Sequence, residues 1–443
     1  MKNPQQRVLY HDNSNSSRSF RDRQMMYNIT RGIFMSRKVV ITGRGLITPI
    51  GNGLAENLQS LKTTKSGIVA MPEWAEMGLD SRIAGKVNIP EDCPAFDRKQ
   101  LRFMPANAQM AVAAAYEAIT EAGYTMETLP GDRMAVINGC AGSAYGEVCG
   151  SVANYEKLRN LRRVSAFSVP RVMPSSAVSS LSLVYGIQGE NYDISCACTS
   201  GAMAIIAGSR LIQSGEYDIV MVGGSEEVSW QQALGFNAMR ALSHSYNDTP
   251  DKASRPFDKT RDGFVIAEGA GIVILESEEH AKKRGAVIHG VVTGYAANSN
   301  ASDMVVPNVI ASQAVMANAL RNAKLDPADI GYINTHGTST GIGDPVEMDA
   351  IRNVFGDAPV AINSTKSVTG HTIGAAGALE AIFCTMMLEH SFISATANLN
   401  EPEDAFLWAD LVREPREKQF RHAISNSFGF GGANASLVIS KYD

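Results

Sequence analysis

The residues NYDISCACTSG occupy positions 191–201 and include the most informative side chain of this sequence. A run with β-branched and aromatic residues ends at Ile194, and a stretch rich in small residues, 201–214, follows Cys198. This pattern predicts a strand, a sharp turn and a buried helix, with a thiol at the turn. The positive end of a helix dipole and free backbone N–H groups favour a nucleophilic thiolate there. The alternative is a buried structural cysteine, which is common for this residue type.

Two later strand-like runs end in histidine. Residues 331–336 read GYINTH and residues 360–371 read VAINSTKSVTGH, so His336 and His371 follow polar turns that contain glycine. Because open α/β sheets place their sites at strand ends, these turns and the Cys198 turn predict one site with a thiol and two imidazoles. For each histidine alone, a structural role with satisfied hydrogen bonds is the alternative.

Four separated motifs resemble those of a known family. The motifs are ACTSG at 197–201, HGTST at 336–340, KSVTGH at 366–371 and NSFGFGG at 426–432. In this order they resemble the β-ketoacyl-acyl-carrier-protein synthases of fatty-acid elongation, and the likeness covers nearly the whole chain. Three further stretches resemble the type I branch, whereas the nucleophile motif is closer to type II; the three stretches are 226–230, 246–255 and 301–307. The resemblance implies an α/β, thiolase-like fold with two similar halves in five layers (α-β-α-β-α).

The same resemblance implies a decarboxylative Claisen condensation. Cys198 would take an acyl group from acyl carrier protein, and malonyl carrier protein would lose CO2 and attack that thioester. Neutral His336 and His371 would donate hydrogen bonds to the enolate oxygen. The backbone N–H groups of Cys198 and Phe430 would form the oxyanion hole, and Phe430 would also gate the acyl pocket. A core aromatic in a turn is the alternative for Phe430.

Lys366 and Glu380 complete the catalytic set that the resemblance implies. Glu380 lies among small apolar residues, where burial of an unpaired carboxylate would cost free energy of folding. Lys366 is therefore its expected buried partner. A surface lysine beside a turn is the alternative for Lys366.

Five residues are expected to bind substrate. The resemblance implies that the hydroxyls of Thr338 and Thr340 bind the phosphopantetheine arm. It also implies that Phe428 and Asp344 contact the substrate. Strand-end capping is the alternative for the threonines, and a helix N-cap before Pro345 is the alternative for Asp344. Gly142 leaves room where type II members often carry a bulky residue, so we expect acceptance of cis-unsaturated acyl chains.

Two local basic clusters are expected to dock the acidic carrier protein. They contain Lys99, Arg102, Arg159, Arg162 and Arg163. Charged patches speed encounter and set specificity, whereas solvated helix faces are the default interpretation of such clusters. The resemblance also implies a homodimer.

Composition agrees with a globular enzyme that has a large core, but does not by itself identify one. The chain has 443 residues, 44% of them hydrophobic and 19% charged, with a net charge of −5, which does not favour nucleic-acid binding. The six cysteines form neither a zinc spacing nor a disulfide framework, and no apolar run is long enough for a membrane span. We therefore expect a cytoplasmic enzyme without a metal or redox cofactor, with a structural monovalent cation left open.

The chain is expected to contain a leader and two halves. Residues 1–35 are polar and are expected to be disordered or absent from the natural protein, with a start at Met35; a transit peptide is the alternative. The halves are expected at 36–284, with the nucleophile, and 285–443, with the histidines. The expected strands include 39–42, 134–138, 219–222, 287–293 and 435–440, and the expected helices include 106–122 and 376–389.

Other functions remain open at this point. One is a type II synthase with a different chain-length preference. A thiolase would need a second cysteine in the loop 428–434, which has none. A chain-length factor would lack Cys198. A non-catalytic homologue that binds carrier protein is the last alternative.

Overall fold

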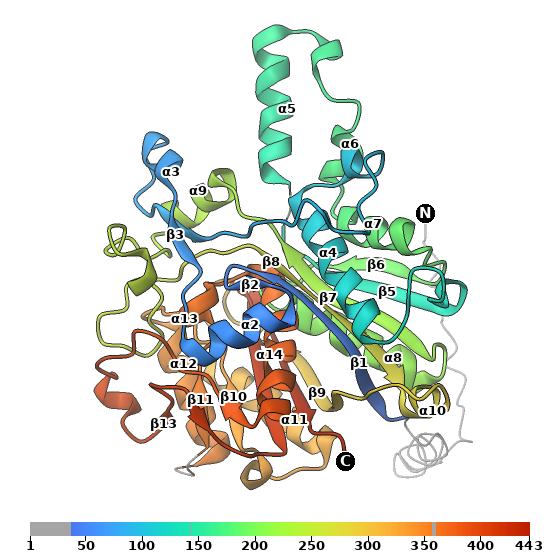
Figure 1. Cartoon of the computed structure of the whole chain (residues 1–443). Coiled ribbons are helices and arrows are strands. Elements are labelled where there is room, and N and C mark those ends of the chain that lie inside the picture. The colour runs from blue at the N-terminus through green and yellow to red at the C-terminus, as the bar shows by residue number, and fades with distance from the viewer. Residues whose placement is uncertain (1–36, 143, 357–359) are drawn as a thin grey trace, which may run out of the picture. The chain divides into compact units, whose positions relative to one another are not determined.

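Ten principal strands form two half-sheets with the same strand order (Figure 1). The computed structural model describes residues 37–142, 144–356 and 360–443, so the expected leader 1–35 lies outside the described residues. The first half contains, in chain order, β1 (Val39–Thr48), β5 (Met134–Gly139), β6 (Asn191–Ile194), β7 (Ile219–Glu226) and β8 (Gly269–Ser277). The second half contains β9 (Gly290–Ser299), β10 (Tyr332–Asn334), β11 (Ala361–Asn363), β15 (His422–Phe428) and β16 (Ala433–Ser440).

The topology repeats between the halves. Numbered along the chain within each half, the strands lie in the order first, fifth, fourth, second, third in both. The two half-sheets join where β1 and β9 pair antiparallel, with Val39–Ile41 opposite Gly290–Val292. The two similar halves expected from the sequence are therefore present in the fold.

Two buried helices lie between the half-sheets (Figure 1). These are α8 (Ser200–Ser214) and α14 (Ala376–His390), which contact each other and strands of both halves. All but the last two residues of α14 are buried, which accounts for its apolar sequence on every side. A Cβ on Gly377 would lie 2.8 Å from the backbone nitrogen of Ala202, so the close approach of these helices requires glycine.

The outer layers complete the five-layer architecture. Helices α4 (Ala106–Glu121) and α7 (Ser176–Tyr185) pack on the first half-sheet, and α11 (Val309–Ala323) and α12 (Gly343–Phe355) cover the second. Smaller elements decorate these layers: β2 (Gly51–Asn52), α2 (Gly53–Thr63), β3 (Ile68–Ala70), α3 (Pro72–Glu76), β4 (Ile83–Gly85), α9 (Trp230–Ala238), α10 (Glu278–Lys283), α13 (Lys366–Thr369), β12 (Phe392–Ile393), β13 (Asp410–Leu411) and β14 (Arg416–Glu417).

Most expected elements are present, with one shift. The strands expected at 39–42, 134–138, 219–222 and 435–440 exist and are longer, and the helices expected at 106–122 and 376–389 end within one residue of those bounds. The strand expected at 287–293 was placed too early, because β9 begins at Gly290 and runs to Ser299. Residues 284–289 form the connection from α10, in which the N–H of His289 donates to the Ile41 carbonyl at 2.8 Å before ladder pairing begins.

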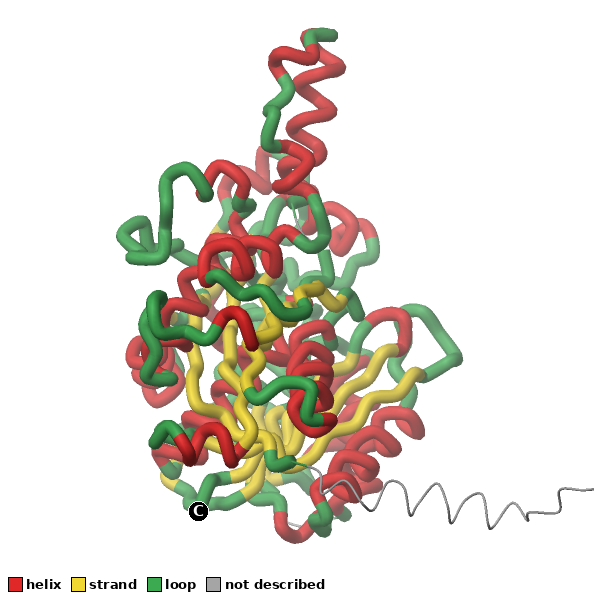
Figure 2. The backbone as a smooth tube through the Cα atoms, turned by 90° about the vertical axis from the view of Figure 1, so that its right-hand side faces the viewer, coloured by secondary structure: helices red, strands yellow, loops and turns green. Residues whose placement is uncertain are grey.

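A helical hairpin extends away from the sheet (Figures 1 and 2). It contains α5 (Tyr145–Leu158) and the short α6 (Ser168–Val172). Exposed apolar residues recur at spacings of three or four along α5, at Val148, Val152, Tyr155 and Leu158. Such a stripe is the face that a helix presents to a partner.

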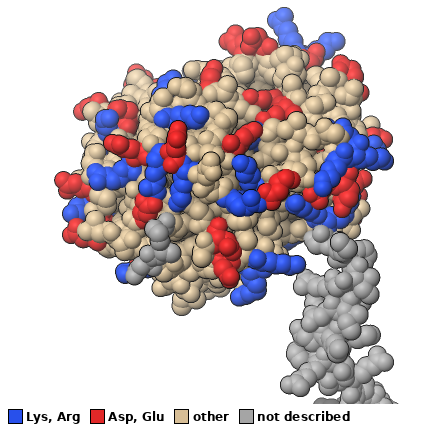
Figure 3. Space-filling view, turned by 60° about the horizontal axis from the view of Figure 1, so that its bottom comes forward, with Lys and Arg blue, Asp and Glu red and all other residues tan. Residues whose placement is uncertain are grey.

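The surface is of mixed charge on the face shown in Figure 3, where basic and acidic side chains are interspersed. Among the helices of the described residues, none is long and apolar enough to cross a membrane.

Candidate active site

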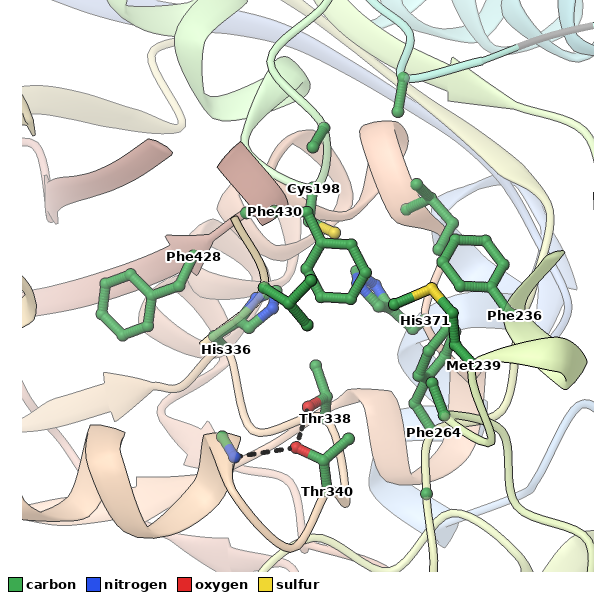
Figure 4. Close-up of a pocket in the computed structure, with 18 of the residues that line it drawn as sticks. Cys198, Phe236, Met239, Phe264, His336, Thr338, Thr340, His371, Phe428 and Phe430 are labelled. Carbon is green, nitrogen blue, oxygen red and sulfur yellow. Dashed lines mark hydrogen bonds between the residues drawn. The ribbon is translucent and has the colours of Figure 1, made fainter. Parts of the chain in front are cut away.

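Three turns bring a thiol and two imidazoles together (Figure 4). Cys198 precedes α8, His336 follows β10, and His371 follows α13. The Cys198 sulfur and one ring nitrogen of each histidine lie within 4.8 Å of one another. The imidazole rings meet edge to face, with centroids 5.1 Å apart and planes at 87°. Residues separated by up to 173 positions therefore form one cluster, as their strand-end positions predicted.

The backbone around Cys198 forms a cradle of N–H groups. The N–H groups of Phe430 and of Cys198 itself lie where they hydrogen-bond a charged Cys198 sulfur. A Cβ on Gly429 would lie 3.1 Å from the carbonyl oxygen of Cys196 and 3.2 Å from the nitrogen of Cys198, so glycine allows this close approach. A cavity opens beside Cys198, and Phe430 is one of the residues that line it. In Figure 4 the ring of Phe430 lies in front of Cys198.

Cys198 is a neutral thiol in the resting site. Burial raises its pKa to about 11, although the Lys366 charge and the two backbone N–H groups act in the opposite direction. The sequence-based expectation of a stabilised thiolate was therefore wrong. Distant segments that pack around Cys198, including Phe264 and Ile373, reduce the contact of this residue with water, and this desolvation outweighs the two backbone N–H groups and the Lys366 charge.

Both histidines are neutral as well. Burial is the largest cause that lowers the pKa of His336 and of His371 well below 6.5, and the Lys366 charge lowers both further. Nδ1 of His336 and both ring nitrogens of His371 are buried without a hydrogen-bond partner in the described part of the chain. A neutral imidazole offers one N–H donor and one acceptor, and the described residues engage none of these three nitrogens.

Lys366 forms a buried ion pair with Glu380 of α14, and both residues are only 2% exposed. Burial raises the pKa of Glu380 to about 7 against the attraction of Lys366. Neither residue lines the cavity. The expected buried pair is therefore present, and the Lys366 charge acts on Cys198 and on the two histidines.

Lys366→Met is expected to lower the free energy of unfolding by about 3–5 kcal/mol, because the variant leaves the Glu380 carboxylate buried without its cation. Urea denaturation would measure the loss. Lys366→Met/Glu380→Leu should recover much of it, and Lys252→Met, at an exposed position, serves as the control. If the free energy of unfolding of Lys366→Met lies within about 1 kcal/mol of the wild-type value, this account of the pair is contradicted.

Glu347 is a site residue that sequence reasoning missed. Its buried carboxylate, on α12, accepts the N–H groups of His336 at 2.9 Å and Gly337 at 2.8 Å, and the side-chain amide of Asn426 at 3.2 Å. Burial raises its pKa to about 7. It therefore fixes the turn that presents the His336 imidazole. Glu347 lies on the same helix face as the core residues Met348 and Ile351. A glutamate on such an apolar face was a signal in the sequence for a buried carboxylate.

Glu226, at the end of β7, was also missed as a site residue. Its carboxylate accepts N–H groups from Ala141 at 2.9 Å, Gly142 at 3.1 Å and Gly374 at 3.0 Å, and burial raises its pKa to about 8. It joins the Gly142 turn to the loop that follows His371. An acidic residue at the end of a buried strand was the signal in the sequence.

The cluster opens into a cavity of about 860 Å³. Thr338, Thr340, Phe428 and Gly142 line this cavity, together with Cys198 and both histidines. The hydroxyls of Thr338 and Thr340 lie 3.1 Å apart, and the Thr340 hydroxyl accepts the N–H of Gly343 at 3.1 Å (Figure 4). A Cβ on Gly142 would lie 2.5 Å from the Tyr145 hydroxyl, so the tyrosine fills part of the space beside this glycine.

Asp344 does not line the cavity, so its expected substrate contact is not seen. It is not the N-cap of α12 either, because that position is Ile342. Its fully buried carboxylate accepts the N–H groups of Phe257 at 2.9 Å and Ser339 at 3.1 Å. Burial raises its pKa to about 6. Asp344 thus holds the threonine turn in place.

The basic residues expected to dock carrier protein are exposed and lie outside the cavity lining; they are Lys99, Arg102, Arg159, Arg162 and Arg163. The Arg102 guanidinium lies 5.3 Å from the ring centroid of Phe167, which also packs edge-on against Phe103 at 4.9 Å. Arg159 follows α5 directly. Both basic clusters thus neighbour the projecting hairpin.

Cys198, His336 and His371 are also ligand types that bind transition metals. Their three ligand atoms lie within 4.8 Å of one another. None of the six cysteines, all in the described residues, forms a disulfide.

Comparisons with known proteins match most of the chain to β-ketoacyl synthases. Two family models match, "Beta-ketoacyl synthase, N-terminal domain" at residues 36–281 and "Beta-ketoacyl synthase, C-terminal domain" at residues 289–400. The 3-oxoacyl-[acyl-carrier-protein] synthase 1 of Haemophilus influenzae is 43% identical over 411 residues, 92% of this chain and 100% of the relative. The Escherichia coli K12 protein of that name is 41% identical over 407 residues, 91% of this chain and 99% of the relative.

Solved structures agree as well. A β-ketoacyl synthase from Burkholderia phymatum superposes with a TM-score of 0.86 and 35% identity, covering 92% of this chain and 100% of that chain. A ketosynthase solved in complex with its type II polyketide acyl carrier protein gives a TM-score of 0.84 and 31% identity, with the same coverage.

Proposed function

This chain belongs to the β-ketoacyl synthase family, and on that premise we propose how its residues carry out the condensation. The enzyme is an acyltransferase of fatty-acid biosynthesis that joins a malonyl unit to an acyl thioester. The observation that carries the assignment of roles is the convergence of Cys198, His336 and His371 on one cavity.

Acyl transfer to Cys198 is the first step. The sulfur attacks the carbonyl carbon of the acyl thioester on acyl carrier protein, and a neighbouring neutral imidazole accepts the thiol proton. The N–H groups of Cys198 and Phe430 stabilise the negative oxygen of the tetrahedral intermediate. The bond to the phosphopantetheine sulfur then breaks, and that sulfur leaves with the proton. A neutral thiol beside two neutral imidazoles fits this step.

Decarboxylative condensation is the second step. The bond between the malonyl carboxylate and its methylene carbon breaks, CO2 leaves, and the electron pair passes to the thioester oxygen as an enolate. N–H groups of His336 and His371 stabilise that oxygen. The methylene carbon then attacks the acyl–Cys198 carbonyl, the Cys198 sulfur leaves as a thiolate, and a proton from water restores the thiol. The hydroxyls of Thr338 and Thr340 hold the phosphopantetheine arm at the cavity.

The direct test mixes the purified protein with acyl carrier protein and malonyl carrier protein. Mass spectrometry of the product carrier protein should show a β-ketoacyl chain two carbons longer, with CO2 released. Failure to form this product with acyl chains of several lengths would reject the proposed roles.

The partner is acyl carrier protein, and we place its docking on the basic residues near the hairpin. The solved complex between a related ketosynthase and its carrier protein supports this type of partner. Lys99→Glu/Arg102→Glu should raise the KM for carrier-protein substrates about tenfold at low salt, since two surface charges are reversed. Arg321→Glu/Lys324→Glu, at the end of α11, is the matched control. An unchanged KM in the first variant would refute this docking surface.

A homodimer through the edge of the first half-sheet is part of the proposal. Strand β6 ends the described strand order, and Tyr192 on it is exposed. An open strand edge, together with the exposed apolar stripe of α5, supports pairing with a second copy. Analytical ultracentrifugation should give twice the monomer mass, and a monomer at micromolar concentration would contradict it.

The domain boundaries and the acyl preference also remain proposals. We divide the chain into a leader, 1–35, and halves at 36–284 and 285–443; the matched family models end at 281 and begin again at 289, which supports this division.

We also propose that the space beside Gly142 admits cis-unsaturated chains. Elongation of a cis-3-decenoyl carrier protein tests that preference.

A further inference from the structure

The turn that carries Thr338 and Thr340 is held by a segment that lies far away in the sequence. Ser339, between the two threonines, has a backbone φ of 69°, which is uncommon for a residue other than glycine. Its hydroxyl accepts the N–H of Arg255 at 3.1 Å, and its carbonyl accepts the N–H of Gly263 at 3.1 Å. The conformation of the turn therefore depends on contacts that its own sequence does not supply.

Arg261, in the same distant segment, holds the turn with its side chain. This side chain is only 5% exposed, and Arg261 is not among the residues that line the cavity. Its Nε donates to the carbonyl oxygen of Thr340 at 3.1 Å, and its Nη1 donates to the carbonyl oxygen of Asp258 at 2.9 Å. Because a guanidinium group is planar and donates in fixed directions, Arg261 fixes the Thr340 backbone relative to that of Asp258.

Arg261 also pairs with the buried carboxylate of Asp344, which lies 3.6 Å from its Nε. The same carboxylate accepts the N–H groups of Ser339 at 3.1 Å and Thr340 at 3.3 Å. Burial raises the pKa of Asp344, and the Arg261 charge acts in the opposite direction. Arg261 thus acts on the turn twice, directly through the Thr340 carbonyl and indirectly through the Asp344 carboxylate.

We propose that Arg261 is a positioning residue for the phosphopantetheine arm, which it does not touch and which it orients through the Thr340 hydroxyl. The proposal rests on the proposed function, in which the hydroxyls of Thr338 and Thr340 hold that arm. Arg261 fixes the backbone of the residue that carries one hydroxyl, and this hydroxyl lies 3.1 Å from the other. A displaced Thr340 backbone therefore weakens the binding of every substrate that carries the arm.

The test is a double-mutant cycle of Arg261→Lys and Thr340→Val, with acyl carrier protein as the varied substrate. Lysine keeps a positive charge beside Asp344 but lacks the planar guanidinium group. Arg261→Lys should raise the KM about tenfold and leave kcat within about twofold, because it weakens arm binding equally in the ground and transition states. Thr340→Val should raise the KM by a similar factor. The double variant should also show a rise of about tenfold rather than about a hundredfold, because both substitutions remove the same contact with the arm.

Two controls separate positioning from general damage to the fold. Iodoacetamide should alkylate Cys198 at the same rate in Arg261→Lys and in the wild type, because this reagent carries no arm; peptide mass spectrometry measures the rate. Arg413→Lys is the matched variant, since Arg413 also donates to two backbone carbonyls, those of Leu399 at 3.1 Å and Asn400 at 2.6 Å, but lies outside the cavity lining. This variant should keep the wild-type KM.

Three results would overturn the inference while the proposed function stands. In the first, Arg261→Lys or Thr340→Val keeps the wild-type KM. In the second, the two increases in KM multiply in the double variant. In the third, alkylation of Cys198 in Arg261→Lys slows as much as the KM rises. A wild-type protein that forms no β-ketoacyl carrier protein would instead reject the proposed function, and the inference with it.

Discussion

Cys198→Ala is expected to lower condensation by about 10⁴-fold or more, which is the scale on which removal of a covalent nucleophile acts. The variant has no sulfur to carry the acyl group, and no other thiol belongs to the cluster with His336 and His371 among the described residues. Steady-state formation of β-ketoacyl carrier protein would measure the effect.

Cys196→Ala is the matched control for this prediction. Cys196 lies two residues away on the same turn but is not part of that cluster. We expect this variant to keep most of the activity. Equal losses in the two variants would indicate damage to the turn rather than loss of a nucleophile, and wild-type activity in Cys198→Ala would reject covalent catalysis at this residue.

His336→Ala is expected to slow CO2 release from malonyl carrier protein by about 10²–10³-fold, the usual effect of removing one donor to a developing oxyanion. Burial lowers the pKa of the imidazole, and its Nδ1 is unpaired among the described residues, as the proposed hydrogen bond to the enolate oxygen requires. Release of labelled CO2 by pre-acylated enzyme isolates this step from acyl transfer.

The pH dependence of that step supplies a second readout. Because burial and Lys366 lower the pKa of both histidines, the neutral donors persist as the pH falls past 6.5. The ratio of the wild-type rate of CO2 release to the His336→Ala rate should therefore stay level from about pH 8 down to 6.5, because carboxyl groups that titrate in this range, such as Glu347, are present in both proteins. His422→Ala, at the start of β15, is the control and should match the wild type. A ratio that halves near pH 6.5, or an unaffected His336→Ala, would contradict the assigned role.

The sequence predicted the location of the site well, because the relevant signals are local. Cys198, His336 and His371 each follow a strand-like run, with a glycine within three residues, and parallel strand ends gather at one edge of a sheet. The Lys366–Glu380 pair was predictable for a similar reason, since a carboxylate within an apolar helix requires a cation.

The properties that sequence reasoning missed depend on long-range packing. The pKa of Cys198 is raised by burial among residues from other segments. The position of Cys198 next to a helix N-terminus therefore predicted the wrong direction for this pKa shift. Glu226 binds N–H groups 85 and 148 residues away, and no local pattern specifies such partners. Asp344 shows the same limit, because its carboxylate stabilises a turn through the distant Phe257.

The most direct test of the central claim is peptide mass spectrometry of the protein after incubation with acyl carrier protein that carries an acyl chain. The account predicts one acyl group, attached to the sulfur of Cys198 and discharged when malonyl carrier protein is added. Acyl mass on Cys196 or Cys140, or none on the protein, would contradict it.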